Sequence, residues 1–149
     1  MGSMYKSFRT DQNAEKSGII IDYGDFRVTI ARAGGANKKY QRVLENVTRP
    51  FRRAIQTEQM DNERAEDLLK IVYARSIVRN WELKQEDAES GEVTWVEGIE
   101  GSEGDVLPVN EENIILTFDN LPDLFADIKE QAAKQALFRS SLREEAAGN

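Results

Sequence analysis

The sequence predicts an α+β fold in which an N-terminal β-hairpin packs on a small bundle of about four helices. Residues 18–31 are rich in β-branched side chains and are divided by a glycine-led turn, which is typical of a hairpin. Later segments repeat apolar residues at helical spacing. The length of 149 residues fits one domain. We expect that domain to span residues 18–143, between a flexible N-terminus over 1–17 and a flexible tail over 144–149.

Composition limits the chemistry that the chain can perform. The sequence has no cysteine and no histidine, which excludes disulfides, thiolate or imidazole zinc sites, cysteine nucleophiles and Ser-His triads. Mean hydropathy is −0.60 and no long apolar run occurs, so we expect neither a membrane span nor a signal peptide. Met1-Gly2-Ser3 before Met4 resembles a tag scar. The expectation is a cytoplasmic protein that is not an enzyme and uses no cofactor or metal.

Charge is unevenly distributed along the chain, whose net charge is −7. Residues 26–53 hold eight basic residues against Glu45 alone, whereas residues 82–130 hold fifteen acidic residues against two lysines. Such a chain can pair its own halves or steer an oppositely charged partner. We expect internal pairing across a solvated surface. Binding to nucleic acid is not expected, because the protein is acidic and no reading element accompanies the basic residues.

The first elements are two strands joined by Gly24-Asp25, with glycine first as a type II′ turn requires. Apolar and polar residues alternate over 26–31, which predicts a half-buried second strand. A two-stranded ribbon is marginal in water, so a helix should cover its apolar face.

A helix is predicted from a cap at Asn37 to about Val47. The Gly34-Gly35 pair before it and Lys38-Lys39 at its start lack the spacing of a dinucleotide or phosphate loop. An ordinary strand-to-helix turn is therefore favoured. Pro50 starts or kinks the next turn.

Asp61 predicts the cap of a third helix, which carries the most continuous apolar stripe and ends at about Arg79. Glu66 and Lys70 are spaced for an ion pair on its surface. Trp81 is expected just after this helix, with its side chain packed against the core.

Residues 85–106 form an acidic, glycine-rich insertion, expected as a loop or a small hairpin. Residues 92–97 would be one arm, with Ile99 on the return. Glu100 to Asp105 lacks the spacing and closing glutamate of a calcium loop. Trp95 in such a loop would be unusually exposed, which favours a role in binding.

The last predicted elements are a short apolar segment capped near Asn110 and a long helix from Leu121 to about Arg143. Asn120 is a suitable cap for the second helix, and Pro122 needs no donor in its first turn. Beyond Ile128 the apolar face thins to alanines. A helix of this kind either closes a small core or leaves a surface for a partner.

Six short motifs follow one another in an order that can be compared with that of known proteins. They are Tyr23-Gly24-Asp25-Phe26-Arg27-Val28, Ala31-Arg32-Ala33-Gly34-Gly35-Ala36-Asn37, Arg49-Pro50-Phe51-Arg52, Trp81-Glu82, Pro108-Val109-Asn110-Glu111-Glu112-Asn113 and Leu121-Pro122-Asp123-Leu124-Phe125. In this order the chain, over residues 8–143, resembles the tail assembly chaperones of tailed phages and prophages. It departs from that pattern in the long insertion at 85–105, where a short Asp-Gly turn would be expected.

The resemblance implies a non-enzymatic chaperone that binds the phage tape measure protein and keeps it soluble for tail tube polymerisation. The tail tube protein is a further possible partner. Such a chaperone would act in the cytoplasm of the host bacterium and be absent from the mature virion. Many of these chaperones also have a frameshifted longer form, and Gly148-Asn149 can be encoded by part of a slippery heptamer.

Two other functions stay open at this point. One is a structural part of the phage, such as a tail-completion or connector subunit. The other is an enzyme that uses carboxylates such as Glu111, Glu112, Asp123 and Asp127. The enzyme is disfavoured, because dipole compensation in the helices explains these residues without chemistry.

The candidate partner-binding surface follows from apolar side chains near the C-terminus and in the insertion. Tape measure proteins are long and helical with apolar stripes, so a helix-in-groove contact is the natural mode of binding. The candidate residues are Leu124, Phe125, Leu137, Phe138, Leu142 and Trp95. The oligomeric state stays open.

Overall fold

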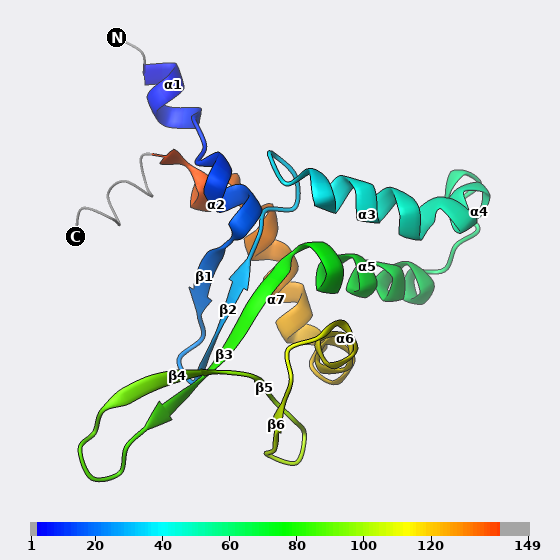
Figure 1. Cartoon of the computed structure of the whole chain (residues 1–149). Helices are drawn as coiled ribbons and strands as arrows, with labels where there is room; N and C mark the ends of the chain where they lie inside the picture. Colours follow the sequence, from blue (N-terminus) through cyan, green and yellow to red (C-terminus); the bar gives the residue numbers. More distant parts are fainter. Residues whose placement is uncertain (1–2, 141–149) are drawn as a thin grey trace.

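A four-stranded antiparallel sheet forms the centre of the computed structural model, which describes residues 3–140 (Figure 1). Its strands lie in chain order: β1 (Ile19–Asp22), β2 (Phe26–Ile30), β3 (Val78–Glu86) and β4 (Val93–Glu97). A second, two-stranded sheet pairs β5 (Ile99–Glu100) with β6 (Val106–Leu107).

Helices make up most of the rest of the described chain. The α-helices are α1 (Ser3–Phe8), α2 (Gln12–Ser17), α3 (Lys38–Thr48), α4 (Arg52–Gln56), α5 (Asn62–Ser76), α6 (Glu111–Asn120) and α7 (Pro122–Ala133). Short 3₁₀ helices η1 (Arg49–Phe51) and η2 (Gln135–Phe138) complete the set among the described residues. The α+β class and the N-terminal hairpin are confirmed.

The N-terminal hairpin has the predicted strands and turn. Ile19 pairs with Ile30 and Asp22 with Arg27, and the Asp22 side chain accepts a hydrogen bond from the Gly24 N–H at 2.8 Å. The hairpin does not stand alone, because β3 adds to it along β2 with a register shift between Thr29 and Ile30.

Strand β3 was not predicted, because the third helix was expected to continue to Arg79. That helix, α5, ends at Ser76, and the chain enters β3 two residues later. Trp81 is buried as expected, but it belongs to this strand. The burial pattern of β3 does not alternate regularly, so periodicity gave no strand signal.

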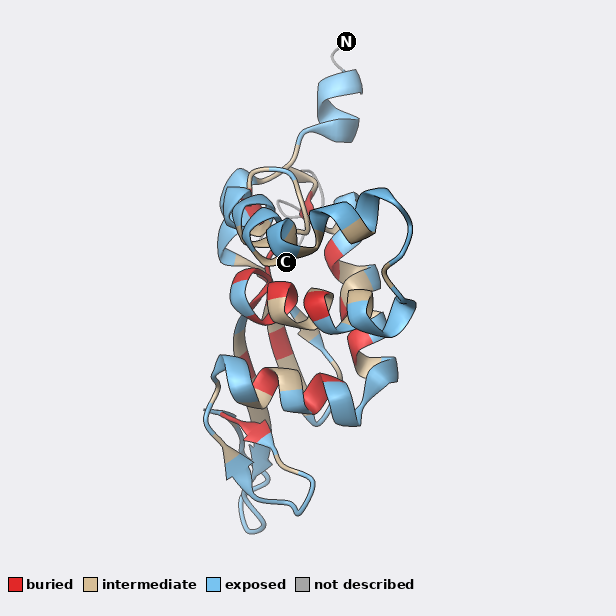
Figure 2. Cartoon of the chain, turned by 90° about the vertical axis from the view of Figure 1, so that its right-hand side faces the viewer, coloured by how far each residue is buried: buried red, intermediate tan, exposed pale blue. Residues whose placement is uncertain are grey.

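Aromatic side chains connect the sheet to the helices in the core. Phe26 stacks on Trp81 at 5.9 Å, and Phe118 of α6 lies 6.5 Å from Trp81 and 4.6 Å from Phe125 of α7. Tyr73 of α5 meets Phe125 edge to face at 5.6 Å. Figure 2 shows the buried segments gathered in the middle of the molecule, between the projecting helix α1 and the exposed hairpin tips.

Helices α3 and α5 lie side by side as a projecting arm, with α4 at its end (Figure 1). No residue of α3 is buried, and its apolar stripe is only half-buried. Asn37 does not cap α3. Its side-chain amide donates instead to the carbonyl oxygens of Arg32 at 2.9 Å and Ser76 at 3.1 Å, which ties the start of the arm to the end of α5.

The long C-terminal helix predicted from Leu121 to Arg143 is wrong in its second half. Helix α7 ends at Ala133, Lys134 is extended, and η2 follows. The chain turns here because η2 bonds to the N-terminal segment: the Asp11 N–H donates to the Phe138 carbonyl at 2.7 Å. Asn120 also does not cap α7, since it forms the last turn of α6.

The N-terminal segment differs from the frayed stretch that the sequence predicted. The Asp11 side chain caps α2 by accepting from the N–H groups of Asn13 and Ala14 at 3.1 Å. Helix α2 then buries Ala14 and Glu15. The tail over 144–149 lies outside the described residues.

The predicted Glu66–Lys70 pair is replaced by contacts between helices. Lys70 pairs with Asp119 of α6 at 2.9 Å, and Glu66 pairs with Lys129 of α7 at 2.6 Å. Lys70 also pairs within α5, but with Asp67 at 3.5 Å rather than with Glu66. In the span 3–140, no helix has both the length and the apolar character needed to cross a bilayer.

Candidate protein-interaction groove

The predicted partner-binding residues separate into core and surface. Phe125 and Phe138 are 1% and 0% exposed, so both are core side chains and cannot contact a partner in this structure. Leu137 is half-buried against the same core, and Leu142 lies outside the described residues. Leu124 is half-buried and keeps an accessible surface.

Trp95 lies in strand β4, within the hairpin arm expected over residues 92–97, but this arm pairs with β3 and not with the segment at Ile99. Trp95 is opposite Lys84 of β3, and the Arg27 guanidinium lies 4.2 Å from the centre of its ring. Arg27 also pairs with Glu82 at 2.8 Å. This cation–π contact covers the indole on the sheet face away from the helices, so its half-buried state has a structural explanation.

An apolar groove lies where the end of β3, the small β5–β6 sheet and the α6–α7 junction meet. Two adjoining hollows of about 170 Å³ and about 70 Å³ share Glu100, Thr117 and Leu121. The apolar side chains along them are Phe26, Trp81, Leu83, Ile99, Leu107, Leu116, Leu121 and Leu124. The hollows are smaller than the roughly 300–1,000 Å³ of a small-molecule site, so they suit single side chains of a partner.

Exposed apolar side chains stand at the edge of this groove. Leu121 is 53% exposed and lines both hollows, and Leu116 is 46% exposed and lines the larger one. Exposed Val96 is opposite the groove residue Leu83 in the sheet. Exposed apolar groups that gather beside a hollow favour an interaction site over scattered single residues.

Acidic residues accompany the groove on both of its sides. Glu100 lines both hollows, Glu103 and Asp105 follow it in the β5–β6 turn, and Asp123 lies between the groove residues Leu121 and Leu124 in the chain. None of these four takes part in an ion pair within residues 3–140. We call this site, apolar residues and acidic rim together, the acidic groove.

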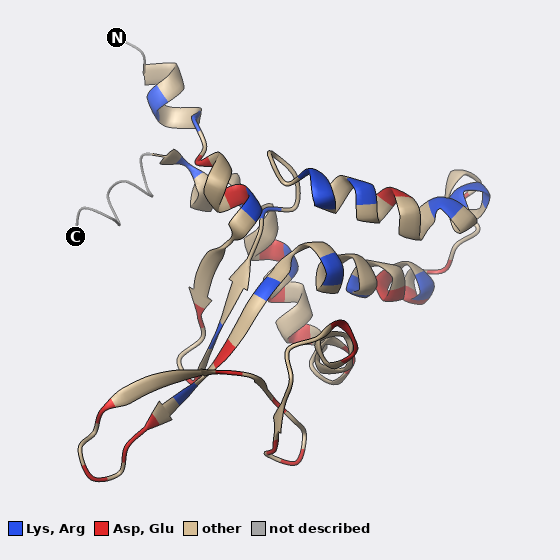
Figure 3. Cartoon of the chain, in the orientation of Figure 1, with Lys and Arg blue, Asp and Glu red and all other residues tan. Residues whose placement is uncertain are grey.

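The expected pairing between the basic and acidic parts of the sequence is largely wrong. Within the part of the chain that the structure describes, Arg27–Glu82 is the one ion pair that joins residues 26–53 to residues 82–130. The basic residues lie mostly along the α3–α4 arm, and the acidic residues gather at the hairpin tips and α6 (Figure 3). The basic segment therefore does not neutralise the negative charge of the acidic groove, which can attract a basic partner.

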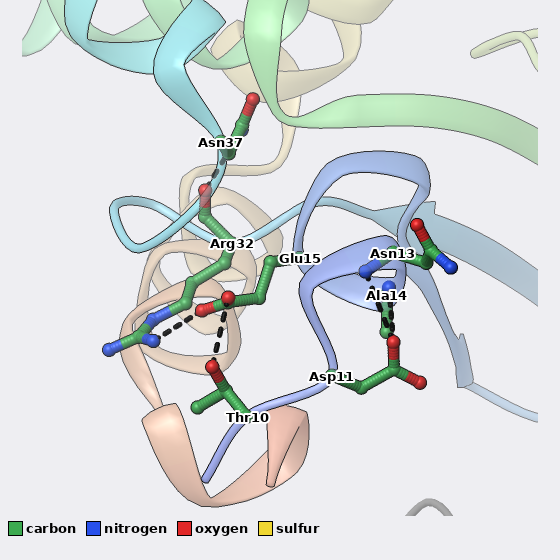
Figure 4. A network of polar contacts seen from close by, with 7 residues as sticks. All are labelled: Thr10, Asp11, Asn13, Ala14, Glu15, Arg32 and Asn37. Atoms are coloured by element: carbon green, nitrogen blue, oxygen red, sulfur yellow. Dashed lines mark hydrogen bonds and ion pairs between the residues drawn. The ribbon is translucent and has the colours of Figure 1, made fainter. Parts of the chain in front are cut away.

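A second polar cluster, shown in Figure 4, is structural. The buried Glu15 carboxylate accepts a hydrogen bond from Thr10 Oγ1 at 3.0 Å and pairs with the Arg32 guanidinium. The Arg32 carbonyl accepts from Asn37. These contacts join α2 to the turn before α3 and satisfy the buried carboxylate of Glu15.

Polar groups of several kinds line the acidic groove. They are the Glu100 carboxylate, the Ser102 and Thr117 hydroxyls and the Asn120 side-chain amide. Across residues 3–140, no group of three or more acidic residues is arranged to hold a metal ion. Recognition of an apolar segment with basic flanks is the chemistry that this arrangement supports.

Comparison with protein families indicates where the chain comes from. Residues 35–149 match the family model of the YdaY prophage protein, which covers most of the chain. The chain belongs to the YdaY prophage protein family. Neither the comparison with curated proteins nor that with solved structures finds a match. The prophage origin implied by the sequence motifs is thus confirmed at the level of the family.

The match includes most of the acidic groove of this YdaY-family protein, because β3 to α7 lie within it. Sequence reasoning found Leu124 but missed Leu116 and Leu121 as surface residues. A signal existed for Leu116, which lies off the buried face marked by Ile114 and Phe118 in α6. No local sequence signal predicts that the β5–β6 turn lies beside the α6–α7 junction.

Proposed function

We propose that this YdaY-family prophage protein is a non-enzymatic tail assembly chaperone. It binds helical segments of the phage tape measure protein in the acidic groove and keeps that protein soluble for tail tube polymerisation. The observation that carries the proposal is an exposed apolar groove with an acidic rim that has no internal partner. The order of the sequence motifs, which resembles that of tail assembly chaperones, supports the same function.

The groove has the features needed to recognise an amphipathic helix. Such a helix presents anchor side chains at positions i, i+3, i+4 and i+7, which can enter adjoining hollows in line. Burying one leucine-sized side chain contributes about 1.5–3 kcal/mol. Basic residues beside the anchors would meet the acidic rim, which speeds association and fixes orientation.

Binding through a few side chains suits a transient holder. The tape measure protein is the client of this chaperone. Held by two or three anchor side chains, it dissociates when tube subunits compete for its apolar stripe, because few contacts give fast dissociation. The proposal places the protein in the host cytoplasm and outside the finished virion. The tail tube protein is the second candidate partner, because it takes over the client.

The structural alternative, a tail-completion or connector subunit, differs in location. A structural subunit co-purifies with virions, and a chaperone does not. Induction of the prophage followed by purification of particles therefore separates the two functions, with recovery of the protein at subunit stoichiometry contradicting the chaperone.

Co-expression with the tape measure protein of the same prophage tests the proposal. The wild-type chain should keep the tape measure protein in the supernatant. Leu121→Glu should lower that soluble fraction, because losing an apolar contact of about 1.4 kcal/mol in the groove weakens binding about tenfold. Ile20→Glu is the matched control, because Ile20 is also 53% exposed and lies in β1, away from the groove.

Circular dichroism establishes that both variants fold. Equal loss of the soluble client with both variants would mean a non-specific effect of charge, and no loss with either would remove the groove from the proposal. An insoluble tape measure protein beside wild-type chain would overturn the chaperone function itself.

A further inference from the structure

Helix α1 carries an apolar face that stays largely exposed within residues 3–140, where the Arg139 guanidinium lies 5.0 Å from the centre of the Phe8 ring. Met4, Tyr5 and Phe8 are 64%, 61% and 61% exposed, and no residue of α1 is buried. Positions 4, 5 and 8 fall on one side of a helix. Figures 1 and 2 show α1 projecting from the body of the molecule. Three large apolar side chains together on a projecting segment indicate a contact surface.

The charge of α1 is opposite to that of the acidic groove. Lys6 and Arg9 flank the apolar face, and residues 3–9 contain no acidic side chain. The groove combines leucines with an acidic rim. Helix α1 therefore has both properties, apolar anchors and basic flanks, that the groove recognises.

Helix α1 cannot reach the groove of its own molecule. It lies at the opposite end of the fold from α6 and the β5–β6 sheet in both views (Figures 1 and 2). The residues that follow it are fixed to the C-terminal part: the Ser140 N–H donates to the Arg9 carbonyl at 2.8 Å, and Asp11 bonds to Phe138. The groove that α1 fits must belong to another copy.

We propose that α1 of one copy docks in the acidic groove of a second copy. The two surfaces are different, so the contact is heterologous and leaves one free α1 and one free groove on each pair. Copies therefore add head to tail into short chains or a ring. The inference uses the groove of the proposed function, with another copy rather than the tape measure protein as its occupant.

The contact has the strength of a weak interface. A six-residue helix covers far less than the roughly 1,200 Å² of a standard stable interface, so association needs high protein concentration. A client with a longer apolar helix displaces α1 from the groove. Self-association then protects the groove while no client is present.

Sedimentation velocity of the full chain over a concentration series tests the inference. The wild-type chain should rise from the 16.9 kDa monomer to a weight-average mass above that of two copies. The double variant Met4→Ser/Phe8→Ser removes two of the apolar side chains of α1. The variant Leu121→Glu places a negative charge where an apolar side chain lines the groove. Each variant alone should stay monomeric at the highest concentration, while Ile20→Glu should assemble like the wild type.

Mixing the two defective variants gives the decisive measurement. The α1 variant keeps an intact groove and the Leu121→Glu variant keeps an intact α1, so the mixture should form a dimer and nothing larger. A mixture that stays monomeric, a monomeric wild type, or assembly by either variant alone overturns the inference.

The outcomes also distinguish the inference from the proposed function. A monomeric wild type that still solubilises the tape measure protein removes the self-association and keeps the chaperone. Assembly that Leu121→Glu abolishes, without any change in the soluble client, keeps the self-association and removes the groove as the client site.

Discussion

Glu15 is the residue on which the N-terminal part of the fold depends most. Its side chain is buried in α2, and the Arg32 guanidinium and the Thr10 hydroxyl satisfy its carboxylate. A buried carboxylate costs several kcal/mol to desolvate, which its partners must offset. The pair therefore adds little net stability, but it makes either partner costly to remove alone.

The first prediction concerns this pair. Arg32→Met should lower the free energy of unfolding by about 3–5 kcal/mol, because Glu15 is left buried without its cation. The double variant Glu15→Gln/Arg32→Met should recover most of that loss, since no charge stays buried. Urea denaturation of both variants measures the difference. A single variant within 1 kcal/mol of the wild type, or a double variant as unstable as the single one, contradicts this account.

At the scale of elements, two caps behave as the sequence predicts. Asp61 accepts from the Arg64 N–H at 2.7 Å, and Asn110 accepts from the Asn113 N–H at 2.8 Å. Asn37, like Asn110, directly precedes a helix, yet its amide is a buried donor to two carbonyls. The difference comes from Ser76, which is distant in sequence and therefore invisible to local reasoning.

Asparagine to aspartate substitutions separate the two roles. Asn110→Asp should be close to neutral, because aspartate caps a helix as well as asparagine does. Asn37→Asp should destabilise the fold by at least about 2 kcal/mol, because it removes the donor and places a carboxylate against two carbonyl oxygens. Thermal melts of the two variants measure the contrast, and equal melting temperatures would mean that Asn37 acts as a cap after all.

Local sequence signals predict some parts of the fold and of the groove, and contacts between distant segments determine the rest. The hairpin and the starts of α5 and α6 follow from turn residues, periodicity and caps, all of which are local. The end of α7 does not, because contacts of η2 with residues 9–11 replace helical hydrogen bonds. Phe138 was predicted as surface for that reason, and Leu121 was missed because the groove forms between elements far apart in the chain.

At the scale of the whole molecule, basic and acidic groups occupy different ends. The α3–α4 arm is basic, and the hairpin tips and α6 are acidic (Figure 3). Because one ion pair among the described residues joins the two sequence segments, this separation persists in the folded state. Screening at high salt should therefore weaken both proposed contacts of the acidic groove.

The pH dependence of stability follows from two tyrosines and from the absence of histidine. Burial raises the pKa of the Tyr23 hydroxyl well above its ordinary value near 10, and its hydrogen bond to Asp127 at 2.6 Å adds to the shift. Burial likewise raises the pKa of Tyr73. Both groups stay protonated in the folded chain at pH values where the unfolded chain has begun to lose these protons.

Stability should therefore be nearly constant between about pH 6 and 9 and fall above about pH 10, where the unfolded chain binds fewer protons than the folded one. Each tyrosine contributes at most about 1.4 kcal/mol per pH unit, and half-exposed Tyr23 contributes less because solvent screens it. Thermal melts of the wild type and of Tyr23→Phe/Tyr73→Phe across this range measure the effect. The double variant should lose less stability per pH unit above pH 10, and an identical alkaline decline in both proteins would assign it to lysines such as Lys70, whose pKa is raised by Asp119.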